Sequence, residues 1–492
     1  MRSYRLSKSK VLSGMQCLKR LYLEVHRPEL AETDEGQKAA FATGRIVGEA
    51  ARRQFPDGIL IEHQDDLSEA LKETGAHLSR KGPVTLFEAA FQAEGVLVRC
   101  DVLRRNRADK LTLIEIKSAS EPKPEHELDI AVQTWVLERA GYQLNAIRLG
   151  YINRDFRYRG DGDYAGLFAY QDMRPAVREW LPRIPKLIEN LKRTLAGKMP
   201  KIPLGKQCFE PHECPFRNHC WPEADYPVIN LPRGKSLAFE LLAEGFKDLR
   251  EVPAERIKSE KQRWVHQVTC RGKAELRPDA GITLKGLGYP RYYLDFETVM
   301  FAVPIWKGTR PYEALPFQFS CHVEQKDGCV DHIEFLHDEG SLPLRAFARA
   351  VLDAVGKRGP ILMYSHYEKR ILDALAVRFP DLKRKLAAII GRLVDLHPLT
   401  EQSYYHPAMQ GSWSIKSVLP TIAQDLDYER LGEVHDGGAA STAYLELIAE
   451  NTPAERRAIL RQALLRYCQH DTVAMLEVAR FLQYGRRQNI KL

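Results

Sequence analysis

The chain has 492 residues, of which 44% are apolar and 28% are charged, and this length and composition are typical of a soluble protein with about two to four domains. Lysine and arginine number 73 against 65 aspartates and glutamates, and this scattered basic excess is compatible with a nucleic-acid partner. The charged N-terminus lacks the apolar stretch of a secretory signal, and no run approaches the ~18 apolar residues that cross a bilayer. We therefore expect a cytoplasmic protein without a membrane partner.

Three regions of the chain differ in pattern. Residues 1–225 combine a basic, helical opening with several strand-like runs, and a cysteine cluster ends the region. Residues 226–286 show no strand pattern and predict a small helical connector. Alternation of strands and helices resumes near Tyr289 and continues through the region 287–492. Such alternation predicts two α/β domains joined by the connector.

Local patterns predict several elements of the first region. The runs Val84–Phe91, Val96–Leu103 and Leu111–Ile116 are rich in β-branched and apolar residues and predict strands. Farther on, apolar residues recur at helical spacing from Val177 to Leu195. This pattern predicts one long helix that packs on the core and leads into the cysteines.

The last predicted strand of this region carries an acidic and a basic residue. Alternation places Glu115 and Lys117 on one face of that strand. Asp101 ends the preceding run, and the interval is long enough for a hairpin that returns both carboxylates to one edge. Two carboxylates that share a site repel each other unless a divalent cation neutralises them. A lysine beside them can polarise a scissile phosphate. Taken alone, Glu-x-Lys on a strand is usually a solvated face.

This arrangement resembles the PD-(D/E)XK nuclease fold, and within it the RecB-like branch, over roughly residues 1–225. By this resemblance Asp101 is the first acidic position, and Glu115 and Lys117 form the acid-x-lysine signature. The resemblance implies that Asp101 and Glu115 bind Mg²⁺ or Mn²⁺ and that Lys117 is catalytic.

Three further residues enter through the same resemblance. Gln133 matches the glutamine of the branch's Gln-x-x-x-Tyr motif, although Leu137 stands where the tyrosine belongs. Glu49 falls where the family has a helical histidine or glutamate ligand, and Glu88 is an additional acidic group on a preceding strand. For Glu49 and Glu88, a role in the site and a place on an ordinary surface are equally supported.

Three of the nine cysteines, Cys208, Cys214 and Cys220, are separated by two gaps of five residues. An odd number of cysteines in a chain without an export signal argues against a disulfide framework. Closely spaced cysteines among prolines and polar residues are typical of thiolate ligands. Cys17 is the expected fourth ligand.

RecB-like nucleases with iron–sulfur clusters resemble this layout, with one cysteine before the nuclease core and three after it. The resemblance implies a 4Fe–4S cluster that clips the two ends of the domain together. The commonest family pattern places two of the late cysteines only two residues apart, which is not so here. Zinc therefore remains an alternative, with His212 and His219 as further ligands, and so does a site without metal.

A second acidic set lies in the last region. Asp295 and Glu297 share one face of an aromatic-rich predicted strand, where two carboxylates are costly unless a cation binds. Near the C-terminus, Tyr467 and Asp471 lie one turn apart on a predicted helix. Between these motifs, Glu368 follows a short predicted strand.

Together these motifs resemble the DnaQ-like exonucleases of the RNase H fold over about residues 289–485. The resemblance implies that Asp295, Glu297, Glu368 and Asp471 bind two divalent ions, which fix the phosphate and activate water, and that Tyr467 orients this water. The family has an aspartate at the middle position, so Asp373 and Asp395 compete with Glu368. We favour Glu368 because it lies just past the strand.

Aromatic and basic residues between these motifs admit two interpretations. Tyr404 and Tyr405 could stack nucleic-acid bases, and Lys416 could meet a phosphate. These residues fit equally well as ordinary parts of the core and surface.

The whole chain is similar to a bacterial family that fuses an iron–sulfur RecB-like nuclease to a DnaQ-like exonuclease. This resemblance implies a nuclease that hydrolyses DNA, at single strands or ends, in nucleic-acid processing, repair or defence. The C-terminal centre would cut from 3′ to 5′, and the N-terminal centre would act as an exonuclease or an endonuclease. The alternatives are a nucleic-acid-binding scaffold with inactive centres and an RNA-directed nuclease. The complete acidic sets favour the enzyme.

Overall fold

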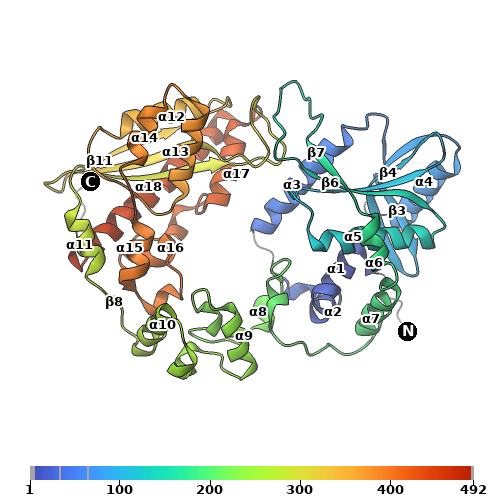
Figure 1. The fold of residues 1–492 in the computed structure, drawn as a ribbon, viewed down its shortest axis with the longest axis horizontal. Helices are drawn as coiled ribbons and strands as arrows, with labels where there is room; N and C mark the ends of the chain where they lie inside the picture. Colours follow the sequence, from blue (N-terminus) through green and yellow to red (C-terminus); the bar gives the residue numbers. More distant parts are fainter. Residues whose placement is uncertain (1–5, 33–34, 64–65, 489–492) are drawn as a thin grey trace. The chain divides into compact units, whose positions relative to one another are not determined.

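The computed structural model describes residues 6–32, 35–63 and 66–488 (Figure 1). The chain divides into two compact α/β units, and each is made of two stretches of sequence. The first unit comprises Met1–Pro222 and Phe301–Glu313, and the second comprises Glu223–Met300 and Ala314–Leu492. Within the described residues, no helix combines the length and apolar character needed to span a membrane.

A seven-stranded mixed sheet forms the centre of the first unit. Its strands follow the order β2-β3-β4-β5-β6-β7, with β1 beside β4. Strands β3, β4 and β5 are antiparallel neighbours, whereas β5 and β6 are parallel and are joined by helix α5. The bounds are β1 Leu6–Ser7, β2 Ile59–Leu60, β3 Val84–Ala93, β4 Val96–Arg105, β5 Leu111–Lys117, α5 Pro124–Arg139, β6 Leu144–Ile152 and β7 Phe168–Asp172.

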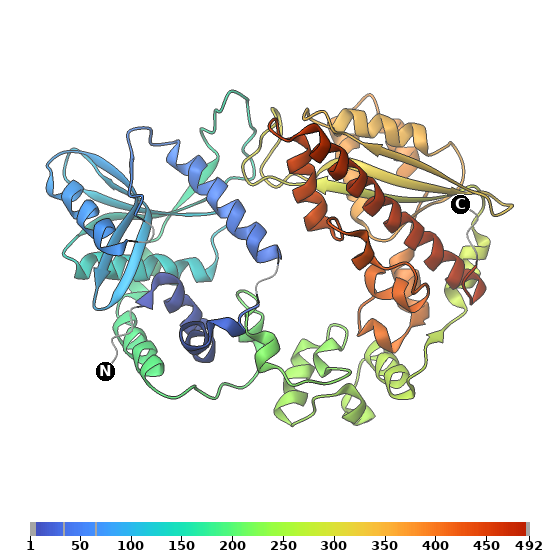
Figure 2. The same ribbon diagram turned by 180° about the vertical axis from the view of Figure 1, so that it is seen from behind.

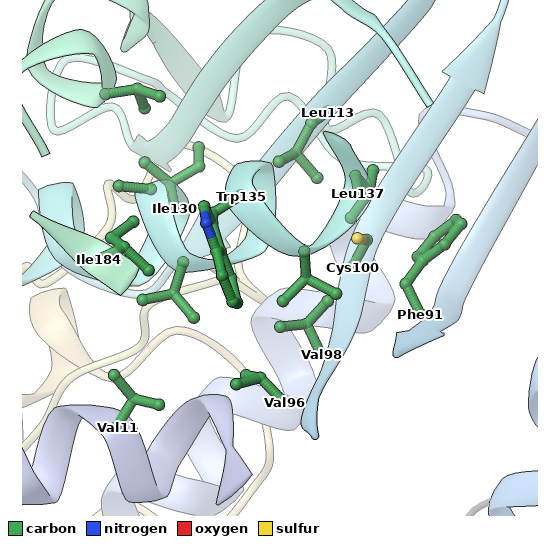
Figure 3. Close-up of a cluster of buried hydrophobic side chains, with 14 of the residues drawn as sticks. Val11, Phe91, Val96, Val98, Cys100, Leu113, Ile130, Trp135, Leu137 and Ile184 are labelled. Atoms are coloured by element: carbon green, nitrogen blue, oxygen red, sulfur yellow. The ribbon is translucent and has the colours of Figure 1, made fainter. Parts of the chain in front are cut away.

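Both faces of this sheet are covered by helices. Along β5, Leu113 faces a core that also contains Ile130 and Trp135 of α5 (Figure 3). The alternate residue Ile114 faces a second core, with Val47 of helix α3 (Glu35–Arg52). The period-two alternation of a strand therefore points Glu115 and Lys117 toward α5.

The predicted helix from Val177 to Leu195 is two helices in the structure. Helix α6 spans Arg174–Trp180 and α7 spans Ile184–Ala196. Pro182 explains the break, because proline has no N–H and disfavours helical geometry in the residue before it. The other helices of this unit are α1 Lys8–Gln16, α2 Leu18–His26, α4 Leu67–Ser79 and α8 Arg217–Cys220.

Residues 301–313 belong to the first unit although they lie between two strands of the second. We call this segment the strap. Ala302 and Val303 are buried in the core that also contains Val47 and Ile114. The backbone N–H of Gly308 donates to the carbonyl of Tyr158 at 2.7 Å. The sequence pattern did not predict this segment as part of the first domain.

The second unit contains a five-stranded sheet in the order β11-β10-β9-β12-β13. Strand β9 is central, antiparallel to β10 and parallel to β12. Strands β8 and β14 form a separate two-stranded sheet. The bounds are β8 Glu275–Leu276, β9 Arg291–Val299, β10 Leu315–Glu324, β11 Val330–Leu336, β12 Ile361–Met363, β13 Leu393–Asp395 and β14 Tyr404–Tyr405.

Helix α18 (Ala454–Tyr484) lies across β9 and β10 on one face of this sheet (Figure 2). On the other face, Phe296 of β9 meets Phe347 of α12 edge to face, with ring centroids 4.9 Å apart. Since neighbouring strand residues point to opposite faces, Asp295 and Glu297 point toward α18. The side-chain amide of Gln318 on β10 also donates to the carbonyl of Leu464, at 2.8 Å, which anchors α18 to the sheet.

The residues predicted as a connector pack into the second unit. Ala238, Leu241 and Trp264 share one core with Tyr293 of β9 and Met475 of α18. The helices of this unit are α9 Lys235–Ala243, α10 Glu260–Arg271, α11 Asp279–Gly286, α12 Leu344–Ala354, α13 Tyr367–Arg378, α14 Lys383–Ile390, α15 Leu396–Ser403, α16 Ile415–Val418, α17 Gly437–Ile448 and α18.

Candidate metal centres

Glu115 is the centre of a buried polar cluster in the first unit. Its side chain is 1% exposed and accepts three hydrogen bonds. Lys8 donates to Oε1 at 2.8 Å and Lys117 donates to the same oxygen at 2.7 Å, while the side-chain amide of Gln133 donates to Oε2 at 2.7 Å. Burial raises the pKa of Glu115, but the ammonium groups of Lys117 and Lys8 outweigh burial and hold it well below its usual range. Glu115 is therefore ionised.

Asp101 of β4 lies beside Glu115 because of the strand register. The neighbouring pair is Val102 with Ile114, and the Oδ2 atom of Asp101 accepts a hydrogen bond from the backbone N–H of Ile116 at 2.7 Å. Burial, followed by repulsion from Glu115, raises the pKa of Asp101 to about 7. A buried carboxyl with this pKa lies near its titration point at neutral pH, where a cation would favour the ionised form.

Two members of this cluster were missed from the sequence. Asp129 lies on α5, one turn before Gln133, and its carboxylate contacts Lys117 at 2.5 Å and Lys8 at 3.1 Å. The Asp-x-x-x-Gln spacing of α5 could have revealed Asp129. Lys8 lies 107 residues before Glu115, and no local pattern connects these two residues.

Lys117 is a cation among carboxylates. Burial lowers the pKa of Lys117, but the charges of Glu115 and Asp129 outweigh it, and the pKa lies above its usual value. Lys117 therefore stays protonated at neutral pH. It can donate hydrogen bonds and attract a negative group, but it cannot accept a proton.

Glu88 and Glu49 differ in their relation to this cluster. Glu88 has a positive φ of 55° within β3, at the position opposite Asp101, where the ladder of β3 and β4 is interrupted. Burial, opposed by Arg99 and Lys8, raises its pKa. Glu49 is exposed on α3 and, within the described chain, it forms no hydrogen bond or ion pair with Glu115. The structure thus brings Glu88 to the cluster, but not Glu49.

The four predicted cysteine ligands are brought together by the structure. All four are free and line one pocket, together with Arg20 and Phe216. Burial, with contributions from Cys17, raises the pKa values of the Cys208 and Cys214 thiols. The side-chain amide of Gln16 donates to the carbonyls of Gln207 and His212, both at 2.7 Å, and so ties the end of α1 to the cysteine loop.

A compact group of possible metal ligands lies in the second unit. Among the described residues, one group of three possible ligand atoms from Cys, His, Asp or Glu side chains lies within 4.8 Å. It consists of Asp295, Glu297 and Cys468. Cys17, Cys208, Cys214 and Cys220 are not part of this group. Tetrahedral zinc, with Zn–S bonds of about 2.3 Å, would hold its sulfurs ~3.8 Å apart.

The second unit brings four carboxylates into one buried site, which we call the tetracarboxylate cluster. Its members are Asp295 and Glu297 on β9, Glu368 in the first turn of α13 and Asp471 on α18. Burial raises the pKa of Asp295 well above its usual range, and Asp471, Glu368 and Glu297 raise it further. Burial and Asp471 act in the same direction on Glu297.

The other two members of this cluster also have raised pKa values. Burial raises the pKa of Glu368 to about 7 and that of Asp471 to about 6. Lys416 supplies positive charge that opposes the shifts of Glu297 and Asp471. A cluster of mutually repelling carboxylates is stable in its ionised form only with added cations.

Two tyrosines contact Asp471. The hydroxyl of Tyr428 donates to Oδ1 at 2.5 Å, and Tyr467 also forms a hydrogen bond with Asp471. Burial and the charge of Asp471 raise the pKa values of both phenols far above their usual range, so both remain neutral donors. The ammonium of Lys416 lies 5.0 Å from the ring centroid of Tyr428 and 5.4 Å from that of Tyr467. The sequence pattern did not reveal Tyr428, which begins a short 3₁₀ helix, Tyr428–Leu431.

Cys468 is a neighbour of the two acids on β9. Its thiol lies 3.9 Å from Oδ2 of Asp295 and 3.8 Å from the backbone carbonyl of the same residue. Burial raises the pKa of this thiol well above its usual range, so Cys468 is a protonated donor. The oxygen atoms of Asp295 and Glu297 are the better ligands for a hard cation such as Mg²⁺.

The competing acids lie in other environments. Asp373 is exposed and pairs with Lys369 at 2.9 Å. Asp395 accepts a hydrogen bond from the backbone N–H of His397 at 2.9 Å and caps α15, and its charge raises the pKa of Glu368. Glu368 alone among the three is both buried and electrostatically linked to Asp471.

The proposed base-stacking surface at Tyr404 and Tyr405 is wrong. Both side chains are buried, at 2% and 1% exposure. The indole of Trp413 donates to the carbonyl of Tyr404, and the ring of Tyr405 lies 5.4 Å from that of Trp413. They are core residues because β14 pairs with β8 beneath α10 and α18.

Comparison with known proteins adds little to this picture. Residues 292–414, about a quarter of the chain, are similar to a family described as a domain of unknown function (DUF2779). The matched region contains Asp295, Glu297 and Glu368 and ends before Asp471. Comparison with curated proteins gave no match. A crystal structure described as that of SSO0001 aligns with 45% of this chain and 86% of its own, at 17% identity and a TM-score of 0.23, which carries no argument about fold.

The tetracarboxylate cluster predicts how the metal-free protein responds to pH. Unfolded carboxyls titrate near pH 4, whereas Glu368 and Asp471 in the folded chain titrate near 7 and 6. The folded state therefore binds more protons between these values, and its stability falls as pH rises from about 4 to 7. We expect the unfolding temperature in EDTA to fall over this range by calorimetry, and Mg²⁺ or Mn²⁺ to raise it more at pH 8 than at pH 5. Asp295→Asn should weaken both effects, and an equal metal effect at both pH values would contradict the prediction.

Lys8 and Lys10 provide a matched pair of variants. Removal of Lys8 leaves Glu115 and Asp129 with one ammonium fewer, and loss of one partner of a buried ion pair is destabilising. Because the Lys8 side chain is 22% exposed, we expect Lys8→Ala to destabilise the first unit by about 1–3 kcal/mol. Urea-induced unfolding, monitored by hydrogen exchange of the backbone amides of α5, would measure this loss of stability. Lys10→Ala, on the same helix, should have little effect, and equal losses would show that only the helix matters.

Proposed function

We propose that this protein is a metal-dependent nuclease with two catalytic centres that hydrolyses phosphodiester bonds of DNA. The observation that carries the proposal is the tetracarboxylate cluster, in which β9, α13 and α18 bring the four acidic side chains together in one buried site. Natural proteins bury such a set chiefly where divalent cations and a reacting group are bound. The proposal assigns the second unit to the DnaQ-like exonucleases and the first to the RecB-like PD-(D/E)XK nucleases, in line with the motif resemblances.

The donor set of the second unit fits Mg²⁺ or Mn²⁺. Four carboxylates against one lysine leave an excess of negative charge, and their oxygens are the ligand type that these ions prefer. Asp295, Glu297, Glu368 and Asp471 would hold the ions, which supply charge neutralisation for the phosphate and activation of water. Three separate elements, β9, α13 and α18, supply these groups, so the site depends on the folded unit.

The neighbouring side chains of this centre have distinct proposed roles. Tyr428 and Tyr467 are neutral donors on Asp471, so they would orient its carboxylate and a water molecule rather than remove a proton. Lys416 remains available as a positive group above the two rings and would attract a substrate phosphate. Because DnaQ-like enzymes act from the 3′ end, the proposal predicts 3′ to 5′ cleavage by this centre.

The donor set of the first unit fits fewer cations. Asp101, Glu115 and Asp129 are opposed by Lys8 and Lys117, and Glu88 adds a further carboxyl. Four carboxyls and two ammonium groups leave about two negative charges when all are ionised, which one divalent ion would balance. Asp101 and Glu115 would hold that ion, and Lys117 would stabilise charge on the phosphate. The amide oxygen of Gln133 is buried without a hydrogen-bond partner among the described residues, so it can accept from a water at the site.

The four cysteines line one pocket, and this gathering, together with the resemblance to iron–sulfur RecB-like nucleases, supports a 4Fe–4S cluster, with zinc as the alternative. In such a cluster each cysteine binds a different iron. Cys17, Cys208, Cys214 and Cys220 would hold the cluster, whose contribution would be to hold α1 and α2 against residues 206–220. This role matters for catalysis because α1 carries Lys8 at its other end.

Nuclease assays with paired variants test the function. Glu368→Gln and Asp373→Asn change acids on the same helix, but only Glu368 belongs to the tetracarboxylate cluster. With Mn²⁺ and end-labelled single- and double-stranded DNA, we expect Glu368→Gln to lower 3′ to 5′ degradation about 100-fold or more and Asp373→Asn to retain it. Lys117→Ala should remove a different product pattern, and the double variant should be inactive.

Other outcomes of this assay would favour the alternatives. Intact substrates with every metal, combined with retention of DNA on a gel, would support the scaffold. Cleavage of RNA oligonucleotides without cleavage of DNA would assign an RNA substrate. Products that are identical for Lys117→Ala and wild type would leave the second unit as the one catalytic centre.

The cluster has an independent test in anaerobically purified protein. We expect about four irons per chain and the visible absorbance of iron–sulfur charge transfer. Cys17→Ser should lower the iron content and make α1 and α2 sensitive to protease. Cys270→Ser, which changes an exposed cysteine of the second unit, should do neither. One zinc per chain without colour would overturn the assignment.

A further inference from the structure

The first unit contains an open groove that the two centres do not use. One wall is the loop between β6 and β7, with Asn153, Phe156–Arg159 and Gly166, and the other is the strap at Lys307 and Gly308. Its volume is about 810 Å³, within the 300–1000 Å³ typical of ligand sites. The groove is open to solvent and has room for several linked groups of a ligand rather than for a single ion.

Positive charge predominates along this groove. Arg157, Arg159 and Lys307 line it, against one carboxylate, Asp155. The three cations are exposed, and none forms an ion pair or side-chain hydrogen bond with another described residue. By contrast, Arg174, which follows β7, pairs with Asp172 at 2.6 Å. The three groove cations are therefore available to an external anion.

The walls of the groove are held rigid. The backbone of Tyr158 pairs with the strap twice, since its carbonyl accepts from Gly308 at 2.7 Å and its N–H donates to Thr309 at 3.0 Å. The ring of Tyr158 stacks on Tyr164 at 4.8 Å, and the Tyr164 hydroxyl donates to Pro304 at 3.1 Å. The groove cations thus project from a backbone that is already ordered, which reduces the entropy cost of binding.

The groove borders the end of β5 that carries Lys117. The hydroxyl of Tyr312, in the strap, donates to the carbonyl of Ser118, the residue after Lys117. The backbone N–H of Ile152, the last residue of β6 before the β6–β7 loop, donates to the carbonyl of Ala119 at 2.9 Å. Both walls are therefore fastened to the two residues that follow the catalytic lysine.

We propose that this groove binds the sugar–phosphate backbone of a single nucleic-acid strand and leads it to the Glu115 cluster. The proposal rests on the proposed nuclease function for the identity of the strand, but the binding itself does not require cleavage. The lining aromatics Phe156 and Tyr158 are buried, so bases have no exposed ring to stack on. Recognition would be confined to phosphates and would not depend on sequence.

Salt-dependent binding tests the groove. Binding of a labelled single-stranded oligonucleotide is measured in EDTA, so that no cleavage occurs, at several salt concentrations. Each phosphate contact on a single strand contributes about 0.7 to the slope of log affinity against log salt. We expect the variant Arg157→Ala/Arg159→Ala/Lys307→Ala to bind at least about tenfold more weakly and to lose about 2 from the slope.

The matched control removes the same charge at the other end of β5. Lys81, Arg107 and Lys110 are also exposed and lie at or near the β4–β5 turn, away from Lys117. Their triple alanine variant should bind as wild type does, and both variants should keep the wild-type unfolding temperature. Equal affinities and slopes for the two variants would overturn the groove, as would a wild-type protein that binds no oligonucleotide.

The two proposals fail separately. If the wild-type protein cleaves DNA while the groove variant binds the oligonucleotide normally, the groove proposal is wrong and the nuclease proposal is supported. If the wild-type protein cleaves no substrate while the groove variant loses binding, the groove proposal is supported and the nuclease proposal is wrong. A DNA and an RNA oligonucleotide of the same sequence show whether the strand's sugar matters.

Discussion

Repulsion among buried carboxylates is the constraint on which the second unit is built. Asp295 and Glu297 are carried by the central strand, Glu368 by the start of α13 and Asp471 by the middle of a 31-residue helix. Packing on both faces of the sheet must force these elements together against their charges. The aromatic contacts of Phe296 on one face and the anchoring of α18 through Gln318 on the other provide that force. Such stored repulsion is expected where ligand binding later compensates it.

In the first unit, neighbouring lysines reduce the repulsion among the buried acids. Its acids are already paired, because Lys8 and Lys117 share Glu115 and Asp129. One of these cations comes from α1, a helix of nine residues that ends next to Cys17. The electrostatic balance of the cluster therefore depends on the position of a helix whose far end is held at the cysteines. A displacement of the cysteine loop would therefore change the electrostatic balance at Glu115, because it would shift this helix.

Sequence reasoning succeeded where the determining pattern is local. Alternation along a strand placed Glu115 with Lys117, and Asp295 with Glu297, because side chains of a strand repeat every two residues. It failed where partners are distant in sequence, as with Lys8, or lie in a short 3₁₀ helix without a periodic pattern, as with Tyr428. Pro182 also breaks the helix that apolar spacing predicts, because proline interrupts helical hydrogen bonding whereas the spacing of apolar residues continues across it. Tyr404 and Tyr405 show that the sequence around an aromatic pair does not reveal whether its side chains are buried or exposed.

The strap has a consequence for the modularity of the protein. The chain passes from one unit to the other three times, after Pro222, Met300 and Glu313. A chain ending at Pro222 would lack Ala302 and Val303, which belong to the core around Ile114, and would uncover apolar surface beside Phe156 and Tyr158. Neither unit is therefore a segment that recombination could transfer with a single crossover. Gene fusion can join two domains end to end, but in this protein part of the first unit lies within the stretch of sequence that forms the second, and the two must be inherited together.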